Sequence, residues 1–122
     1  MPLVVIVDAA NVVGARPDGW WKDRAGAALR LHDRLLVADV PGDRIVLVLE
    51  GQAKAGVRPG KDAHVETVHA PKDGDSTILR LARAAGSDGH EVIVVTGDRA
   101  LGANVGGVGA RVLGPSWLLD RL

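Results

Sequence analysis

Five acidic residues occupy points in the sequence from which they could act together on a metal ion. Asp8, Glu50 and Asp98 each follow one of the three most apolar segments. Asp73 and Asp75 come just before an amphipathic segment. Crowded carboxylates repel one another, most strongly where water is scarce, so a bound cation stabilises them. Oxygen ligands suit Mg²⁺ or Mn²⁺, whereas a chain with no cysteine and four scattered histidines is a poor zinc ligand.

Each of these acids also has a simpler structural explanation. An aspartate at the start of a helix is a favourable N-cap, which could account for Asp8, for Asp98 and for either Asp73 or Asp75. Glu50 could be a solvated residue at the beginning of a loop. We favour a common function because the predicted fold gathers all of them at one edge of a sheet.

The elements that would position these residues follow from hydrophobic patterning. Short apolar runs without polar alternation predict buried parallel strands. Strands are expected at Leu3–Val7, Arg44–Leu49 and Glu91–Thr96, with weaker strands at His64–His69 and Ala110–Leu113. Helices are expected at Trp21–Val37, Ser76–Ala85, Arg99–Val105 and Pro115–Leu122, and residues 51–61 are expected to be irregular. Alternating strands and helices predict a parallel sheet with right-handed crossovers, whose ligand crevice lies beyond the carboxyl ends of the strands.

Length and composition indicate a single domain over residues 1–122 with enough apolar material for a core. The chain is 47% hydrophobic, and its 15 basic and 15 acidic residues give a formal net charge of zero. Nucleic-acid binding would therefore depend on local patches of cations. The N-terminus lacks the features of a signal peptide, and no apolar run is long enough to span a bilayer, so we expect a cytoplasmic protein without membrane contact.

Polar, cationic and aromatic residues accompany the acids. Asn11 could bind the carboxylate of Asp8 or a substrate phosphate, and Thr96 offers a hydroxyl at the same sheet edge. Arg99 directly follows Asp98 and could pair with it, meet a phosphate or simply lie on a helix surface.

One segment mixes cations with aromatics. It contains Arg16, Trp20, Trp21, Lys22 and Arg24. Nucleic-acid-binding surfaces often combine these residue types, because bases stack on aromatic rings while cations meet phosphates. Packing into the core is the alternative for the tryptophans.

Several nucleotide and phosphate motifs are absent. The turn after the first apolar segment, residues 8–14, lacks the glycine fingerprint of dinucleotide-binding folds, and there is no P-loop. Position 10 is Ala where a haloacid dehalogenase phosphatase would need a second Asp. The Asp and Lys of a response-regulator receiver are not found at the expected strand ends.

Four short segments occur in the order and spacing of one known group of proteins. They are residues 4–11 (VVIVDAAN), 46–51 (VLVLEG), 74–78 (GDSTI) and 94–99 (VVTGDR). Together they resemble the NYN/PIN-like nuclease superfamily, and most closely its YacP-like NYN subgroup. In this resemblance Asp8 is similar to the first metal-binding acid, Asn11 to its companion asparagine and Asp98 to the last acid.

The resemblance implies a Rossmann-like, three-layer α/β/α sandwich around a mainly parallel five-stranded sheet. It implies a ribonuclease that hydrolyses phosphodiester bonds at a Mg²⁺ or Mn²⁺ centre, with RNA, expected to be single-stranded, as its partner. The catalytic residues would be Asp8, Glu50, Asp75 and Asp98, and all of these except Glu50 would bind the metal. The residues expected to bind substrate are Asn11, Arg16, Arg24, Lys54, Arg58, Lys61, Thr96 and Arg99.

The sequence leaves other functions open. Position 76 is Ser where a second acid often follows Asp75 in the family, which suits an RNA-binding or protein-interaction module with little turnover. A metal-dependent phosphotransferase or phosphatase could use the same topology. The choice between Asp73 and Asp75, the number of metal ions, and the presence of a protein partner or a homo-oligomer also stay open.

Overall fold

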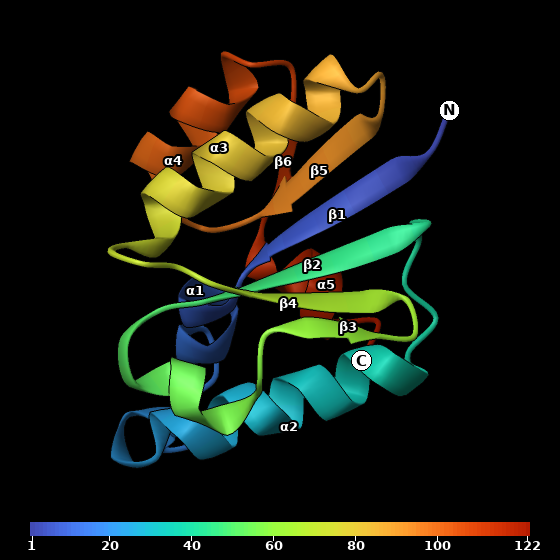
Figure 1. Ribbon diagram of the computed structural model, residues 1–122. Coiled ribbons are helices and arrows are strands. Elements are labelled where there is room, and N and C mark those ends of the chain that lie inside the picture. Colours follow the sequence, from blue (N-terminus) through green and yellow to red (C-terminus); the bar gives the residue numbers. More distant parts are fainter.

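A computed structural model describes residues 1–122 as a six-stranded sheet covered by helices on both faces (Figure 1). The strand order is β3-β4-β2-β1-β5-β6, and every neighbouring pair is parallel except β3 with β4. The strands are β1 (Leu3–Asp8), β2 (Arg44–Leu49), β3 (Gly60–Asp62), β4 (Val65–His69), β5 (Glu91–Val95) and β6 (Arg111–Leu113). The five strands predicted from apolar runs are all present.

The prediction of five strands omitted β3. This strand lies at the sheet edge, pairs antiparallel with β4 and has only three residues, all of them exposed. Its sequence, Gly60-Lys61-Asp62, contains no apolar side chain, so hydrophobic patterning gives no signal for it. Its backbone nevertheless covers the hydrogen-bonding edge that β4 would otherwise expose.

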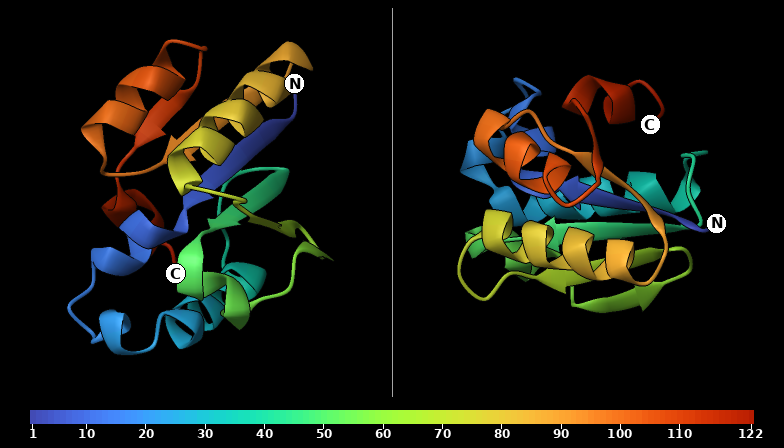
Figure 2. Two further views of the ribbon diagram at one scale, coloured as in Figure 1. Left: turned by 60° about the vertical axis from the view of Figure 1, so that its left-hand side comes forward. Right: turned by 90° about the horizontal axis from the view of Figure 1, so that it is seen from above.

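The helices divide into two layers. α1 (Ala9–Gly14), α2 (Arg24–Val37) and α5 (Pro115–Leu119) cover one face, and α3 (Gly74–Ser87) and α4 (Arg99–Gly106) cover the other. α3 and α4 lie side by side in all the views of Figures 1 and 2. Two 3₁₀ turns, η1 (Trp20–Lys22) and η2 (Gly51–Gly56), complete the fold.

Three helix predictions needed correction. The expected helix Trp21–Val37 is divided, because the side chain of Asp23 accepts a hydrogen bond from the amide of Gly26 and caps a separate α2. α1 was expected to be a turn, since its six residues are too few to show a helical period. The last helix ends at Leu119 rather than Leu122.

The core reflects the alternation of side chains along the parallel strands. In β1, Val5 and Val7 face the cluster formed with α1, α2 and α5, whereas Val4 and Ile6 face the cluster under α3 and α4. Both faces are apolar and buried, which explains why the strands show continuous apolar runs in the sequence. None of the helices is long and apolar enough to cross a membrane.

The connections reverse direction between β1 and β5. From β1 the chain passes through α1 and α2 to β2, and from β4 it returns through α3 to β5 on the opposite face. The carboxyl ends of β1, β2, β4 and β5 all lie on the left in Figure 1. This reversal leaves a crevice at the strand ends, which is where open α/β sheets bind ligands.

Candidate metal and nucleic-acid site

Asp8 occupies the centre of this crevice. It ends β1, is only 4% exposed and accepts a hydrogen bond of 2.8 Å from the hydroxyl of Thr96, which follows β5. The bond joins the two strands between which the topology reverses. Thr96 was expected to contact substrate, but it is buried and holds the Asp8 carboxylate in place.

Asp98 is tied to the same threonine. Its backbone amide donates to the Thr96 hydroxyl oxygen at 3.1 Å, and its Oδ1 accepts from the amide of Leu101 at 3.0 Å. The helix-cap explanation of Asp98 is therefore correct for one carboxylate oxygen. Its Oδ2 makes no hydrogen bond within the protein and remains available to a ligand.

The structure distinguishes Asp73 from Asp75. Asp73 caps α3, with its carboxylate accepting from the amide of Ser76 at 2.7 Å and from the Ser76 hydroxyl at 3.1 Å. These bonds lower the pKa of Asp73. Asp75 lies two residues after Asp73, within the first turn of α3, and its carboxylate accepts no hydrogen bond, so it is the acid whose oxygens are free.

Glu50 connects β2 to the start of α3. Its Oε2 accepts a hydrogen bond of 2.9 Å from the buried amide of Gly74, and a Cβ at position 74 would lie only 3.2 Å from the carboxylate. Glu50 thus fixes the first turn of α3, next to Asp75. One of its oxygens is committed to this structural bond.

The electrostatics show that these carboxylates form one group. Burial raises the pKa of Asp8, and the negative charges of Asp75 and Glu50 raise it further, against the lowering effect of the Thr96 hydrogen bond. Burial likewise raises the pKa of Asp75, with added contributions from Asp98, Glu50 and Asp73.

No cation of the protein neutralises this group. The two ion pairs of the molecule, Arg44 with Glu66 and His32 with Asp33, involve none of its members. Asp8, Glu50, Asp75 and Asp98 are called the acidic cluster below.

The donor set of the acidic cluster fits a hard divalent cation in kind, because it consists only of oxygen atoms without a neutralising partner. The positions of these side chains fit an ion less well than their chemistry does. No three acidic, imidazole or thiol side chains stand close enough together to hold one ion as they are placed here. Binding a cation would require the free carboxylates to rotate toward one another.

Asn11 fixes the loop that carries Asp98. Its Oδ1 accepts from the amide of Gly97 at 2.9 Å, and a Cβ at Gly97 would lie 2.8 Å from that same oxygen. Position 97 therefore needs glycine for the bond to form. The Nδ2 of Asn11 donates to no group of the protein and can still meet a substrate.

Comparisons with known proteins identify the fold. A scan against protein-family models and a search of curated proteins found no match. Among solved structures, the chain is similar to a mutant form of Rae1 (YacP) from Bacillus subtilis. The TM-score is 0.65 with 20% sequence identity, over 96% of this chain and 72% of that chain. This chain has a YacP-like fold. The expected α/β/α sandwich is thereby confirmed.

The predicted substrate-binding cations lie in different parts of the fold, and not all of them are free to bind a ligand. Arg99 is exposed at the start of α4, directly after Asp98, and forms no ion pair. Lys54 instead donates its Nζ to the carbonyl oxygen of Ala70 at 2.9 Å, which ties η2 to the end of β4. Arg58 is exposed between η2 and β3. Lys61 lies in β3, which β4 and β2 separate from β1.

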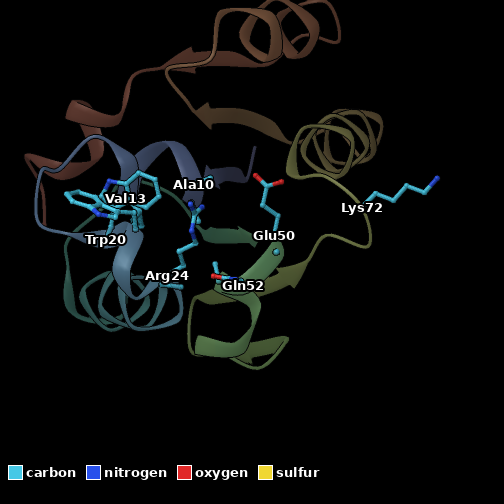
Figure 3. Close-up of a pocket in the computed structure, with 12 residues that line it drawn as sticks. Ala10, Val13, Trp20, Arg24, Glu50, Gln52 and Lys72 are labelled. Carbon is cyan, nitrogen blue, oxygen red and sulfur yellow. The ribbon is translucent and has the colours of Figure 1, made fainter.

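A hollow of about 650 Å³ opens beside the acidic cluster (Figure 3). Its lining includes Ala9, Trp20, Trp21, Arg24, Glu50 and Gln52, and it is called the Arg24 hollow below. Figure 3 shows Arg24 reaching into it from the start of α2, with Gln52 on the η2 side and Glu50 across from Arg24, whereas Lys72 extends away.

Sequence reasoning missed part of this hollow. Gln52 gave no signal, because a single amide in an irregular segment has no recognisable pattern. Arg16 was expected near the other cations, but it lines a smaller hollow of about 50 Å³ together with Arg30 and Arg34. Val13 of α1 contributes to both hollows.

Proposed function

We propose that this protein is a metal-dependent ribonuclease that hydrolyses RNA phosphodiester bonds at the acidic cluster. The observation that supports this most is the convergence of four carboxylates, from four separate segments, at the strand ends of a YacP-like sheet with no protein cation to neutralise them. Such an arrangement costs stability in the absence of a bound ligand, so a structural role alone does not explain it.

Asp8, Asp75 and Asp98 would hold Mg²⁺ or Mn²⁺ through their free oxygens. A bound ion of this kind supplies an activated water and stabilises negative charge on the phosphate. The protein's own contribution is orientation. Thr96 fixes the Asp8 carboxylate, the α4 cap fixes one oxygen of Asp98, and Asn11 fixes the loop between them.

Glu50 has a different proposed role. Its bond to the Gly74 amide makes it a positioning residue that sets the first turn of α3 and so the place of Asp75. The resemblance placed Glu50 among the catalytic residues but not among the metal ligands, and the role proposed here is to position Asp75.

The proposal is tested by measuring cleavage of a labelled single-stranded RNA in Mn²⁺ by the wild type, Asp8→Asn and Asp98→Asn. Asparagine keeps the shape of both side chains and caps a helix as well as aspartate does, so folding should be preserved. Loss of a metal-binding carboxylate should reduce the cleavage rate about a hundredfold or more. Unchanged rates in both variants would overturn the assignment.

The second candidate is an RNA-binding module with little turnover. It is favoured by one observation, that no three side chains of the cluster stand close enough to hold an ion as placed. Ser76 adds to it, since its hydroxyl binds Asp73 and contributes nothing to the cluster. RNA binding by a wild-type protein that cleaves no RNA in Mg²⁺ or Mn²⁺ would support this candidate instead.

A further inference from the structure

We infer that the Arg24 hollow is a nucleobase subsite, in which one unpaired base of the RNA stacks on the guanidinium plane of Arg24. The inference rests on the proposed function and deepens it. It adds a contact that recognises the base to the phosphate chemistry proposed for the acidic cluster.

The first argument is the stacked arrangement of Arg24 itself. Its guanidinium carbon lies 5.0 Å from the centre of the Trp20 ring, and Trp21 stands edge-on to Trp20 with the ring centres 6.0 Å apart at 90°. Arg24 forms no ion pair with any carboxylate. A guanidinium that lies over an aromatic ring and forms no ion pair can also stack on a base, and RNA-binding proteins stack bases on arginine planes.

The second argument is the rigidity of the walls. Trp20 packs against α1, where a Cβ at Gly14 would lie 3.7 Å from the Trp20 ring. On the opposite side, η2 packs against the backbone of α2 at a point where only Gly56 fits, because a Cβ there would overlap the carbonyl oxygen of Ala25. The hollow is therefore shaped before any ligand binds, which reduces the entropy lost on binding.

The third argument concerns which part of a nucleotide the hollow can take. Glu50, a member of the acidic cluster, lies in the lining of the hollow and repels an anion, so a phosphate is disfavoured beside it. A planar, uncharged base suits the apolar part of the lining, which includes Ala9, Ala28 and Ala53. Gln52 supplies an amide that both donates and accepts hydrogen bonds, which is what reading a base edge requires.

The fourth argument is continuity with the acidic cluster. Glu50 belongs to the hollow and also contributes to the raised pKa values of Asp8 and Asp75. Ala9, which directly follows Asp8, lines the same hollow. A nucleotide whose base occupies the hollow therefore has its backbone next to the acids.

The test measures equilibrium binding of fluorescein-labelled single-stranded RNA octamers in EDTA, where metal-dependent cleavage does not occur. One octamer is intact, and the others each carry a single abasic nucleotide at a different position. For the wild type, removing the base at one position should weaken binding about tenfold, the effect of one stacked base. Arg24→Gln should weaken binding of the intact RNA by a similar factor and abolish the abasic penalty.

Arg121→Gln is the matched control. Arg121 also stacks on a tryptophan, with its guanidinium carbon 4.5 Å from the centre of the Trp117 ring, but this pair lines neither hollow. Its substitution removes the same charge from the same kind of contact and should leave both the affinity and the abasic penalty unchanged. Gln52→Ala should instead reduce differences in affinity between octamers that carry different bases at the sensitive position.

Two results would overturn the inference. One is equal affinity of the wild type for the intact and all the abasic octamers. The other is the same abasic penalty in Arg24→Gln as in the wild type. Failure of the nuclease proposal would look different: base-dependent binding would persist in a protein that cleaves no RNA. Conversely, metal-dependent cleavage by a wild type whose binding shows no abasic penalty would keep the nuclease proposal and remove the base subsite.

Discussion

Burial and the neighbouring carboxylates disfavour the ionised form of Asp8. It is buried, and Asp75 and Glu50 add negative charge around it, so its pKa in the folded protein lies above the unperturbed 3.8. Between pH 3.8 and the raised value, the folded state binds more protons than the unfolded state. Stability therefore falls as the pH rises through this window, and it stays lower above it.

Asp8→Asn should consequently stabilise the metal-free protein. Asparagine keeps an oxygen that accepts the Thr96 hydrogen bond and removes the buried charge. We expect the melting temperature to rise by a few degrees at neutral pH, and the difference from wild type to shrink as the pH falls toward 4. Thermal melts in EDTA across this pH range measure the effect. A lower melting temperature at neutral pH would contradict it.

Thr96→Val tests the positioning of the same carboxylate. Valine has nearly the same shape but removes the hydroxyl that donates to Asp8 and accepts from the amide of Asp98. Losing a buried hydrogen bond to a charged group should cost about 1–3 kcal/mol of folding free energy. Losing a residue that orients a metal-binding carboxylate should reduce cleavage about 10- to 100-fold. Thr96→Ser keeps the hydroxyl and should retain most of the stability and most of the cleavage rate. Equal losses of stability and cleavage in the valine and serine variants would argue against this role.

At the scale of elements, Glu50 joins the end of β2 to the start of α3. Glu50→Gln keeps an acceptor for the Gly74 amide, whereas Glu50→Ala leaves this buried amide without a partner. We expect Glu50→Gln to retain cleavage within a few-fold, and Glu50→Ala to lose about 1–3 kcal/mol of stability. Chemical denaturation and cleavage assays distinguish the two. A hundredfold loss of cleavage in Glu50→Gln would make Glu50 a direct metal ligand after all.

Most elements of this fold were predictable because their signals are local. β1, β2 and β5 are buried on both faces and so appear as continuous apolar runs, and the acids that follow them mark the strand ends. β3 and α1 were missed because a three-residue polar edge strand and a six-residue helix carry no usable periodicity. Their existence depends on the neighbouring β4 and on the packing of Val12 into the core.

The candidate site was predictable only where the residues that build it carry a local signal in the sequence. Topology brings Asp8 and Asp98 together, and both follow strong strands. Which of Asp73 and Asp75 faces the cluster depends on helix phase, which the hydrogen bonds to Ser76 decide. The Arg24 hollow depends on η2 packing against α2 through Gly56, a long-range contact without any local signal.

At the scale of the whole molecule, the net charge of zero limits how the chain can hold RNA. The RNA binding proposed above would depend on a few local cations such as Arg24 and Arg99. If three or four cations meet phosphates, the logarithm of the affinity for single-stranded RNA should fall with the logarithm of salt concentration with a slope of about −2 to −3. Binding titrations at several salt concentrations give this slope. A slope near zero would exclude phosphate contacts as the basis of binding.

A cation bound only by the folded protein should also stabilise the whole molecule. The melting temperature is expected to rise with Mn²⁺ concentration. At a hundredfold excess of Mn²⁺ over its dissociation constant, the free energy of unfolding should increase by about 2.7 kcal/mol. Asp8→Asn should abolish most of this dependence while keeping its higher melting temperature in EDTA. A wild-type melting temperature that does not respond to millimolar Mn²⁺ would count against the metal site.

The most direct test compares two neighbouring aspartates on α3. Asp75 contributes to the acidic cluster, whereas Asp73 caps the helix, and both change by the same single charge when replaced by asparagine. The measurement is the single-turnover rate of cleavage of a single-stranded RNA as a function of Mn²⁺ concentration. We predict that Asp75→Asn loses about a hundredfold or more, while Asp73→Asn cleaves at the wild-type rate. Equal rates for the two variants, or equal losses, would contradict the assignment of RNA hydrolysis to the acidic cluster.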